Sequence, residues 1–513
     1  MPKKPFSHLI GFLPPILGIM AMAAISFWYF HLPKVPAGGG RVVEGIIGQP
    51  RLLNPLYADQ NRIDRELSHL VFRGLIKYNA RNQPVGDLAK NWEVKEGGKV
   101  YVVALKPNQY WSDGHPVTAD DVVFTYQLTQ NTAYDGPEKK TFEEVTIDKI
   151  DQNHIQFTLK TAFAPFIENL CTGILPAHLW QQIPLDKLKT HPLNLRPVGS
   201  GPAKFKAIKF SAKIENWVDW IEFSLPDGYL NSIRFKFYPA TSDAITAFKL
   251  GEIMSLNLPT YEDFNKLESW PNAIRLIKPT WGRSLVIIFN LRDEKLKDKK
   301  VRETLAAGLK LETPGVHSSS PIPQISWAHA QQAKDYQVQK NISLPKKINL
   351  KTPYESTYLN TAKTIKNQWK DLGIETVVEP LDQAGIEEII EKHDFETFLI
   401  AQEHGHDPDP YIYWHSSQKE SPLMNLSGIS HPRIDKALEE GRIKLDLEER
   451  KKAYATFQKY FYAEVPAVFL EHLNLYYIAS TKIKGLNIRK LWLPQDRFEN
   501  INEWYLKEKR PLF

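Results

Sequence analysis

The length of this chain sets the first limit on its architecture. A single hydrophobic core stops growing beyond roughly 250 to 300 residues, and this chain has 513. We therefore expect at least two lobes, each with a core of its own. The composition is that of a globular protein, because 42% of the residues are hydrophobic, 24% are charged, and no long polar tract interrupts them.

The charge pattern and the cysteine content exclude several classes of protein. The formal net charge is +6, and basic and acidic residues alternate along the chain instead of forming the concentrated Lys/Arg stripe that binds phosphate backbones. We expect no nucleic-acid partner. Cys171 is the only cysteine, which excludes an intramolecular disulfide and any multi-cysteine metal site.

An apolar run near the N-terminus has the length of a membrane span. It extends from Leu9 to Phe30, and at about 1.5 Å per residue it can cross a hydrocarbon core of about 30 Å. Lys3 and Lys4 precede it, and positive charge before a span favours a cytoplasmic N-terminus. We therefore expect a single-pass transmembrane helix with the rest of the protein outside the cytoplasm.

A cleaved secretory signal is the alternative interpretation of the same segment. Val35 and Ala37 fit a small-residue cleavage pattern, but the apolar run exceeds the roughly 7 to 15 residues of a signal-peptide core. The length favours the uncut anchor. We expect residues 1–41 to form this anchor and a linker, in which "PAGGG" is a flexible spacer.

After residue 42 the sequence alternates between strand and helix patterns. Runs rich in β-branched and aromatic residues predict strands, and apolar residues three and four apart predict helices. Thr118 and Asp121 form a capping box before one of these helices, and Gly373 ends another. This alternation of strand and helix patterns is typical of an α/β fold. The expected strands include 41–50, 99–108, 232–239 and 374–381, and the expected helices include one that begins after Thr118 and those at 244–251, 356–372 and 446–465.

Five blocks of the sequence, in order, resemble the extracellular solute-binding proteins of family 5, the dipeptide- and oligopeptide-binding subunits of ATP-driven importers. No single block is decisive, but the ordered set is specific. The blocks are "LLNPLYADQNRIDRELSHLVFRGLIKYN", "PVGDLAKNWEVKEGGKVYVVALKPNQYWSDGHPVTADDVVFTYQ", "HIQFTLKTAFAPFIENLCTGILPAHLW", "PVGSGPAKFK" and "KDKKVRETLAAGL".

The resemblance implies an α/β, two-lobed periplasmic-binding-protein-like fold in which lobe II is inserted into lobe I. On this chain it implies lobe I at 42–280 with an extra subdomain at about 55–165, lobe II at 281–470, and a return to lobe I at 471–513. It also implies closure of the lobes over a ligand by hinge motion, with crossings near Thr280 and Leu470. We expect a monomer.

The stretch "EHGHDPDPYIYWHSSQ", from Glu403 to Gln418, is the densest cluster of functional side chains. The resemblance implies that an aspartate in an Asp-Pro segment after a buried strand pairs with the peptide ammonium, and Asp407 or Asp409 fits. His404 and His406 stand where relatives usually carry a glycine- and tryptophan-containing stretch, and we expect both to contact the ligand. Tyr411, Tyr413 and Trp414 are expected as packing or pocket residues, with a place in the core as the alternative for Tyr413 and Trp414.

Two further candidates lie at the predicted crossing between the lobes. Trp281 is a large ring that could meet a ligand, and Arg283 offers the forked guanidinium that suits a peptide carboxylate. Trp281 has core packing as an alternative role. Asp407 and Asp409 have one as well, since Asp-Pro pairs commonly cap turns.

The sequence supports a substrate-binding protein over an enzyme. It has no G-x-S-x-G elbow, no H-E-x-x-H helix and no glycine-rich dinucleotide turn. His404, His406 and His415 lack a further ligand at metal-site spacing, so we expect no metal site and no cofactor. We expect capture of a peptide and its delivery to an ABC permease with separate ATPase subunits. The alternatives are a binder of a metal complex, haem or a sugar, and a surface adhesin that reuses the fold.

Overall fold

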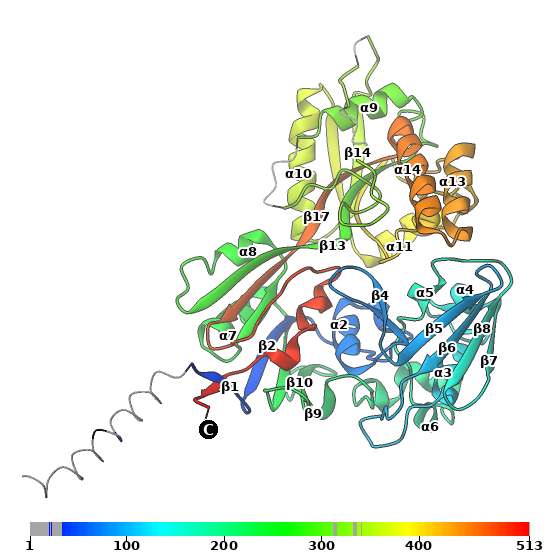
Figure 1. Ribbon diagram of the computed structural model, residues 1–513. Helices are drawn as coiled ribbons and strands as arrows, with labels where there is room; N and C mark the ends of the chain where they lie inside the picture. The colour runs from blue at the N-terminus through cyan, green and yellow to red at the C-terminus, as the bar shows by residue number, and fades with distance from the viewer. Residues whose placement is uncertain are drawn as a thin grey trace, which may run out of the picture.

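The computed structural model describes residues 20, 22, 33–310, 315–331, 336–339 and 341–511. These residues form two lobes joined through one mixed sheet (Figure 1). Across the described ranges, no helix has the length and apolar character needed to cross a membrane. The run from Leu9 to Phe30 lies outside these ranges apart from Met20 and Met22, so the membrane anchor stays a prediction.

The central sheet has ten strands and passes through both lobes. Its outer strands in each lobe are short, and two long strands connect the halves. In spatial order the strands are β15 (Glu375–Leu381), β14 (Lys347–Pro353), β16 (Thr397–Glu403), β13 (Ala273–Phe289), β17 (Ala467–Ser480), β12 (Ser255–Leu258), β2 (Arg41–Ile47), β11 (Ser232–Tyr238), β10 (Val218–Ser224) and β9 (Lys204–Phe210).

The long strands β13 and β17 are antiparallel partners that cross from one lobe to the other (Figure 1). Their register is interrupted between Pro279 and Ser284. In this interval the backbone of β13 forms hydrogen bonds with the C-terminal stretch instead of with β17. Trp281 N donates to Leu491 O at 2.9 Å, and Gly282 N donates to Trp492 O at 2.8 Å. The predicted boundaries at residues 280 and 471 therefore fall inside these two strands.

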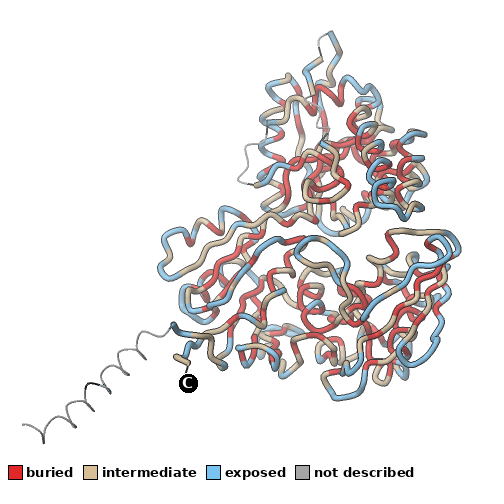
Figure 2. Tube along the Cα trace, in the orientation of Figure 1, coloured by how far each residue is buried: buried red, intermediate tan, exposed pale blue. Residues whose placement is uncertain are grey.

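Lobe II consists of β14, β15, β16 and the adjoining halves of β13 and β17, with helices on both sides. The helices α9 and α10 share one apolar core with β14, and α13 and α14 share another with the opposite face of β16. Figure 2 shows the buried chain running between these layers. The helices of lobe II are α9 (Lys299–Ala307), α10 (Ser356–Asp371), α11 (Gln383–Lys392), α12 (Tyr411–Trp414), α13 (Pro432–Ile443) and α14 (Leu447–Glu464).

Lobe I contains the other half of the central sheet and a subdomain with a separate four-stranded sheet. The strand order of the second sheet is β5 (Ala89–Lys95), β6 (Val100–Leu105), β8 (His154–Leu159) and β7 (Val145–Lys149). Its core extends from Leu75 to Ile174, overlapping the predicted range of 55–165. The helices of lobe I are α2 (Arg62–Val71), α3 (Ala119–Thr129), α4 (Lys139–Phe142), α5 (Phe166–Asn169), α6 (Ala177–Trp180), α7 (Thr241–Lys249) and α8 (Tyr261–Asn265).

Shorter elements complete both lobes. Two small sheets pair β3 (Ile76–Tyr78) with β4 (Pro84–Gly86) and β1 (Val35–Ala37) with β18 (Lys507–Lys509). The 3-10 helices are η1 (Ala58–Gln60), η2 (Leu185–Thr190), η3 (Pro192–Asn194), η4 (Ser416–Gln418), η5 (Pro494–Phe498) and η6 (Ile501–Glu503).

The C-terminal stretch returns to lobe I and is fixed there by a buried ion cluster. Arg497 has no exposed side-chain surface and contacts Glu44 at 3.0 Å and Glu66 at 2.7 Å. These carboxylates come from β2 and α2, so the cluster ties three distant parts of the sequence together. Removing one partner of such a group leaves an uncompensated buried charge.

The segment predicted as a flexible spacer is part of the fold. Residues 35–37 form β1, and Gly39 N donates to Tyr229 O at 2.8 Å. Gly39 and Gly40 have φ angles of 114° and 97°, a conformation that favours glycine. The glycines that predicted flexibility therefore make a tight connection between β1 and β2, and the prediction of a spacer was wrong.

The local predictions for strands and helices were largely confirmed. The capping box of Thr118 and Asp121 starts α3, and α10 ends before Gly373, whose φ is 80°. Asp446 caps α14 by accepting from Glu449 N at 2.9 Å. Helix ends can be predicted from a sequence because their unpaired backbone N–H and C=O groups need partners close by in the chain.

Candidate functional site

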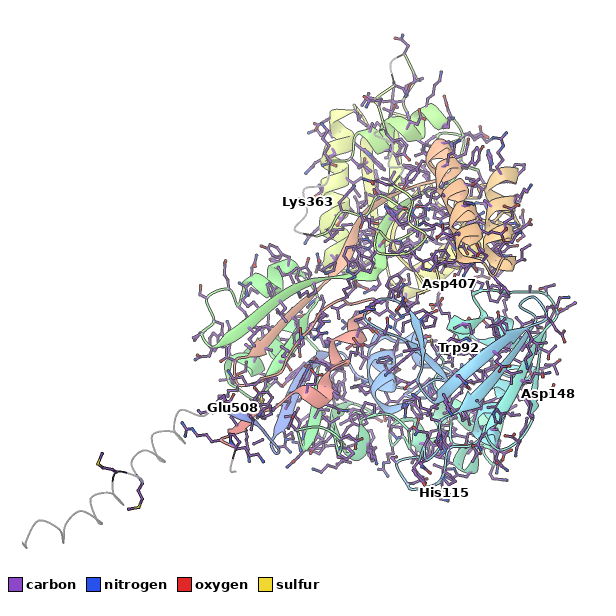
Figure 3. All side chains as sticks on the ribbon, viewed as in Figure 1. Trp92, His115, Asp148, Lys363, Asp407 and Glu508 are labelled. Atoms are coloured by element: carbon purple, nitrogen blue, oxygen red, sulfur yellow. The ribbon has the colours of Figure 1, made fainter. Side chains whose placement is uncertain are left out.

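The segment Glu403–Asp409 lies where lobe II meets lobe I. It follows directly from the end of β16, and Figure 3 shows Asp407 at the border between the two lobes. Several of its backbone and side-chain groups contact lobe I. The predicted cluster is therefore at an interlobe contact, which is the position that a ligand-capturing segment would need.

Glu403 is held between two arginines from different parts of the chain. Arg65 of α2 donates to its carboxylate at 2.7 and 3.1 Å, and Arg283 Nε lies 3.2 Å from it. Burial acts to raise the pKa of Glu403, but the hydrogen bond and charge of Arg65 outweigh it and hold the pKa below its usual range. Because the Glu403 side chain is 40% exposed, it remains within reach of a ligand.

His406 is enclosed by aromatic rings and an amide from lobe I. Its imidazole stacks on Tyr78 with a centroid distance of 4.1 Å and on Trp492 with one of 4.9 Å. Its Nδ1 contacts Asn82 Oδ1, and Asn82 Nδ2 donates to the His406 carbonyl at 3.2 Å. Burial lowers the pKa of His406 to about 3, so the ring is neutral at physiological pH.

Glu168 of α5 is the lobe I residue that binds the backbone of the Glu403–Asp409 segment. Its carboxylate accepts hydrogen bonds from the backbone N–H groups of His406 and Asp407, the second at 3.0 Å. Burial, followed by the charge of Asp407, raises the pKa of Glu168 to about 8. A Cβ on Gly405 would lie 2.5 Å from Glu168 Oε2, so this approach requires glycine.

The two predicted ammonium partners are both paired inside lobe II. The carboxylate of Asp407 accepts hydrogen bonds from Arg450 at 2.6 and 2.8 Å, and the carboxylate of Asp409 accepts one from Arg442 at 2.7 Å. Burial acts against the charged form of Arg450, but the carboxylate of Asp407 raises the pKa of this guanidinium. A peptide ammonium at either aspartate would have to share it with an arginine.

The aromatic residues of the loop differ in their surroundings. Trp414 is 2% exposed and packs edge-on against Phe461 with centroids 4.8 Å apart, which places it in the core of lobe II. Tyr411 is partly exposed, stacks on His415 at 4.0 Å, and lies under Arg442 at 3.8 Å. Tyr413 packs partly buried against the same core.

Trp281 and His404 lie at the interruption of β13. The Trp281 ring is 4.9 Å from that of His472, and His404 N donates to Gly282 O at 2.8 Å. His404 Nε2 is 3.1 Å from Ser284 Oγ. Burial, followed by the charge of His472, lowers the pKa of His404 to about 3, so this imidazole is a neutral hydrogen-bonding group at the crossing.

The three histidines of the loop have separate environments. His404 faces the crossing and His406 faces lobe I, whereas His415 contacts Ser417 at 2.8 Å and Glu439 at 3.3 Å in lobe II. Each imidazole therefore has hydrogen-bonding partners that a shared metal ion would have to replace.

Sequence reasoning missed the lobe I half of this contact. The lobe I side chains come from four separate segments, and the sequence patterns marked none of them as a site residue: Arg65, Tyr78 with Asn82 on the β3–β4 hairpin, Glu168 and Trp492. Helix periodicity gave no signal for Arg65, because α2 holds several charged residues in one run. Only the fold brings these residues to the end of β16.

The arrangement joins positive, negative and neutral hydrogen-bonding groups across two lobes. It can accept charged ends of opposite sign and can stack a planar group. Binding, with no chemistry on the ligand, is what these groups support.

Known proteins resemble this chain along most of its length. The model of the bacterial extracellular solute-binding proteins, family 5, matches residues 83–422. The oligopeptide-binding protein AppA of Bacillus subtilis (strain 168) is 25% identical over 512 residues, covering 92% of each chain. Its structure with a nonapeptide has a TM-score of 0.74 at 24% identity and covers 92% of this chain and 100% of AppA.

A second solved structure comes from a protein with a different ligand. NikZ from Campylobacter jejuni, in complex with Ni(L-His), has a TM-score of 0.73 at 23% identity and covers 91% of this chain and 99% of NikZ. These two structures share the α/β fold of periplasmic binding proteins with this chain. The chain belongs to the bacterial extracellular solute-binding proteins, family 5.

Proposed function

We propose that this protein captures peptides between its two lobes and delivers them to an ABC importer. The contact around Glu403 carries the proposal, because it joins the lobes through charged and hydrogen-bonding groups next to the interruption of β13. The relatives named above include an oligopeptide-binding protein that matches nearly the full length of this chain.

Opening about the crossing strands would release the groups that recognise a peptide. Between Pro279 and Ser284 the pairing of β13 with β17 is interrupted. Fewer hydrogen bonds between these two strands therefore resist rotation of one lobe against the other. Separation of the lobes would part Arg65 from Glu403 and Glu168 from the backbone of His406 and Asp407. A peptide entering this space would replace those contacts with its own.

Within this proposal the charged ends of the peptide meet Glu403 and the two arginines beside it. Glu403 suits the ammonium group, since its side chain is 40% exposed whereas those of Asp407 and Asp409 are 11% and 10% exposed. Arg65 and Arg283 suit the carboxylate, because a guanidinium fork binds carboxylates in a bidentate manner.

The remaining predicted site residues divide into two groups. Trp281, His404 and His406 lie at the lobe border and would contact the peptide backbone or its side chains. Asp407, Asp409, Tyr411 and Trp414 would position the loop, since the side-chain partners described above for them are in lobe II.

The proposal also includes the location of the protein and its partner chains. A family of extracellular solute-binding proteins works outside the cytoplasm, and the apolar run from Leu9 to Phe30 would tether this member to the membrane as a single-pass anchor. The permease and its ATPase subunits would be separate chains, and the binding protein would act as a monomer.

The experiment is native mass spectrometry on the full-length protein, purified without denaturation, with identification of whatever dissociates from it. Bound peptides would support the proposal and would give their length. A random peptide pool should then change the tryptophan fluorescence, because Trp281 and Trp492 both lie at the crossing. Failure of both measurements would overturn peptide capture.

A nickel–amino-acid complex is the second candidate. Neutral imidazoles at the contact, those of His404 and His406, favour it, since a neutral imidazole can ligate a metal. The same mass spectrum separates the two candidates, because a metal complex would add the mass of nickel and a small ligand. An adhesin would carry neither.

A further inference from the structure

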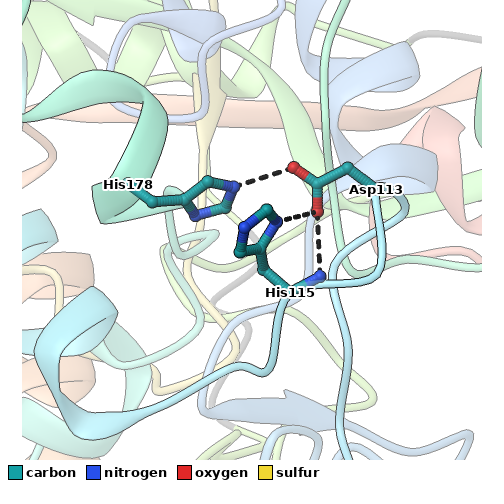
Figure 4. Close-up of side chains that lie close together, drawn as sticks. All are labelled: Asp113, His115 and His178. Atoms are coloured by element: carbon teal, nitrogen blue, oxygen red, sulfur yellow. Dashed lines mark hydrogen bonds and ion pairs between the residues drawn. The ribbon is translucent and has the colours of Figure 1, made fainter.

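Three side chains that could ligate a metal come together on the subdomain of lobe I, away from the lobe border. Asp113 Oδ2 lies 2.8 Å from His178 Nε2, and Asp113 Oδ1 lies 3.3 Å from His115 Nδ1 (Figure 4). The two imidazole rings stack with centroids 4.1 Å apart. One ligand atom from each residue falls within 4.8 Å of the other two.

The backbone that carries Asp113 and His115 is a tight hairpin. Trp111 N donates to His115 O at 2.8 Å, and Gly114 N donates to Trp111 O at 3.0 Å. Gly114 has a φ of 95°, and the Trp111 side chain is 1% exposed beneath the turn. The positions of both ligands are therefore set by hydrogen bonds and packing that do not depend on a cation.

His178 is presented by α6, which is tied to the neighbouring helix. Asp121 of α3 accepts a hydrogen bond from Ala177 N at 2.8 Å, and Trp180 anchors the other end of α6 in the core at 2% exposure. The hairpin and α6 thus hold their ligands at fixed places. Preorganised ligands lose little entropy when they bind a cation.

The donor set points to a particular class of cation. Two imidazoles and one carboxylate suit zinc and its neighbours, whereas calcium and magnesium prefer oxygen ligands alone. Within the described residues, these three side chains have no hydrogen-bond or ion-pair partner outside their own group. Three protein ligands leave a further position for water, and the partial exposure of Asp113 and His178, each 27% at the side chain, gives a cation access.

The cluster is separate from the proposed ligand contact. Figure 3 shows His115 at the bottom of lobe I, on the side opposite the lobe border where Asp407 lies. A cation bound there would join the hairpin to α6 within lobe I and would not touch a ligand between the lobes. Its effect would be on the stability of lobe I.

We propose that Asp113, His115 and His178 form a binding site for one divalent transition-metal cation of the zinc class, which clamps the hairpin at Asp113 to α6. The proposal goes beyond ligand capture and does not depend on the identity of the captured solute. The sequence did not reveal the site, because His178 is far along the chain from the other two ligands.

The test titrates untagged full-length protein with Co²⁺ and follows the ligand-field absorption, then displaces Co²⁺ with Zn²⁺. The wild type should bind one Co²⁺ with the bands of a tetrahedral nitrogen and oxygen site. His115→Ala and His178→Ala should each weaken binding by at least about tenfold, because each removes one of three ligands. Zn²⁺ should raise the unfolding temperature of the wild type and leave that of both variants unchanged.

The matched control is His154→Ala. His154 is also an exposed histidine of this subdomain and contacts Asp151 at 2.9 Å, but it has no second imidazole beside it. This variant should bind Co²⁺ as the wild type does. Absence of binding by the wild type, or equal binding by all four proteins, would overturn the site and leave Asp113, His115 and His178 as a hydrogen-bonded group only.

Discussion

Arg65 in lobe I and Glu403 in lobe II are joined by two hydrogen bonds, of 2.7 and 3.1 Å, across the border between the lobes. Arg65 is on α2 and Glu403 is the last residue of β16, and 338 positions separate them in the chain. The pair therefore reports directly on whether the lobes are together. Four predictions follow from this border and its surroundings.

Replacing Arg65 by Ala should favour the open form of the ligand-free protein. A hydrogen bond to a charged group contributes about 1.5 to 3 kcal/mol, and the 40% exposure of Glu403 reduces this to about 1 kcal/mol. The ratio of closed to open protein should fall about fivefold, seen as a larger radius of gyration in X-ray scattering. Arg62→Ala is the control, because Arg62 is on the same helix and contacts only Glu66 of lobe I, at 4.0 Å.

The closure of the lobes should depend on pH through Glu168. Burial, followed by the charge of Asp407 in lobe II, raises its pKa from 4.5 to about 8, so the closed form binds the proton more tightly than an open form with an ordinary carboxyl. Closure is then fully favoured below about pH 4.5 and weakens as the pH rises through about 8. The radius of gyration should increase over this range, and Glu168→Gln should remove the dependence.

Glu138→Gln is the control for that measurement. Glu138 is in the same lobe and burial raises its pKa to about 7, but its hydrogen-bond partner is Thr172, in lobe I. This variant should keep the pH dependence of closure. If Glu168→Gln titrated like the wild type while Glu138→Gln did not, the assignment of Glu168 would be wrong.

A methyl group on Gly405 should also hold the lobes apart. The Cβ of Gly405→Ala would lie 2.5 Å from Glu168 Oε2, closer than atoms approach without displacement. The radius of gyration should rise, whereas the unfolding temperature of each lobe should change little, because Gly405 is exposed and outside both cores. Gly38→Ala is the matched control, since its nearest neighbour, Tyr229 O, is 4.0 Å away; an unchanged radius in Gly405→Ala would contradict the prediction.

Asp407→Asn should destabilise lobe II more than it alters ligand recognition. The change leaves Arg450, whose side chain is 7% exposed, without its carboxylate, and breaking a buried pair costs about 3 to 5 kcal/mol. Denaturant unfolding should show this loss, with a smaller one for Asp409→Asn, because Arg442 is 27% exposed. The double change Asp407→Asn and Arg450→Met should recover part of the stability.

Peptide binding by the Asp407→Asn variant tests whether Asp407 also recognises the ligand. If Asp407→Asn kept the stability of the wild type and lost peptide binding, then Asp407 would be the ammonium partner that the sequence suggested. Glu403→Gln is the complementary variant, since Glu403 is the more accessible carboxylate. Fluorescence titration with a peptide identified by mass spectrometry measures both variants.

The sequence determined the local elements and the position of the contact loop. The capping box at Thr118 and the glycine after α10 are set by neighbours in the chain, and local hydrogen-bond needs fix such ends. The buried strand before the Asp-Pro segment was also predicted, and β16 (Thr397–Glu403) lies there.

Only the tertiary structure decided which of these residues face the other lobe. Asp407 and Asp409 could each serve a ligand or a turn by sequence, and the fold supplies Arg450 and Arg442 as their partners. Arg65, Glu168 and the cluster of Asp113, His115 and His178 have no local pattern, because their partners lie tens to hundreds of residues away. A sequence records spacing along the chain, and charge pairing across a fold depends on distances that only the packed structure sets.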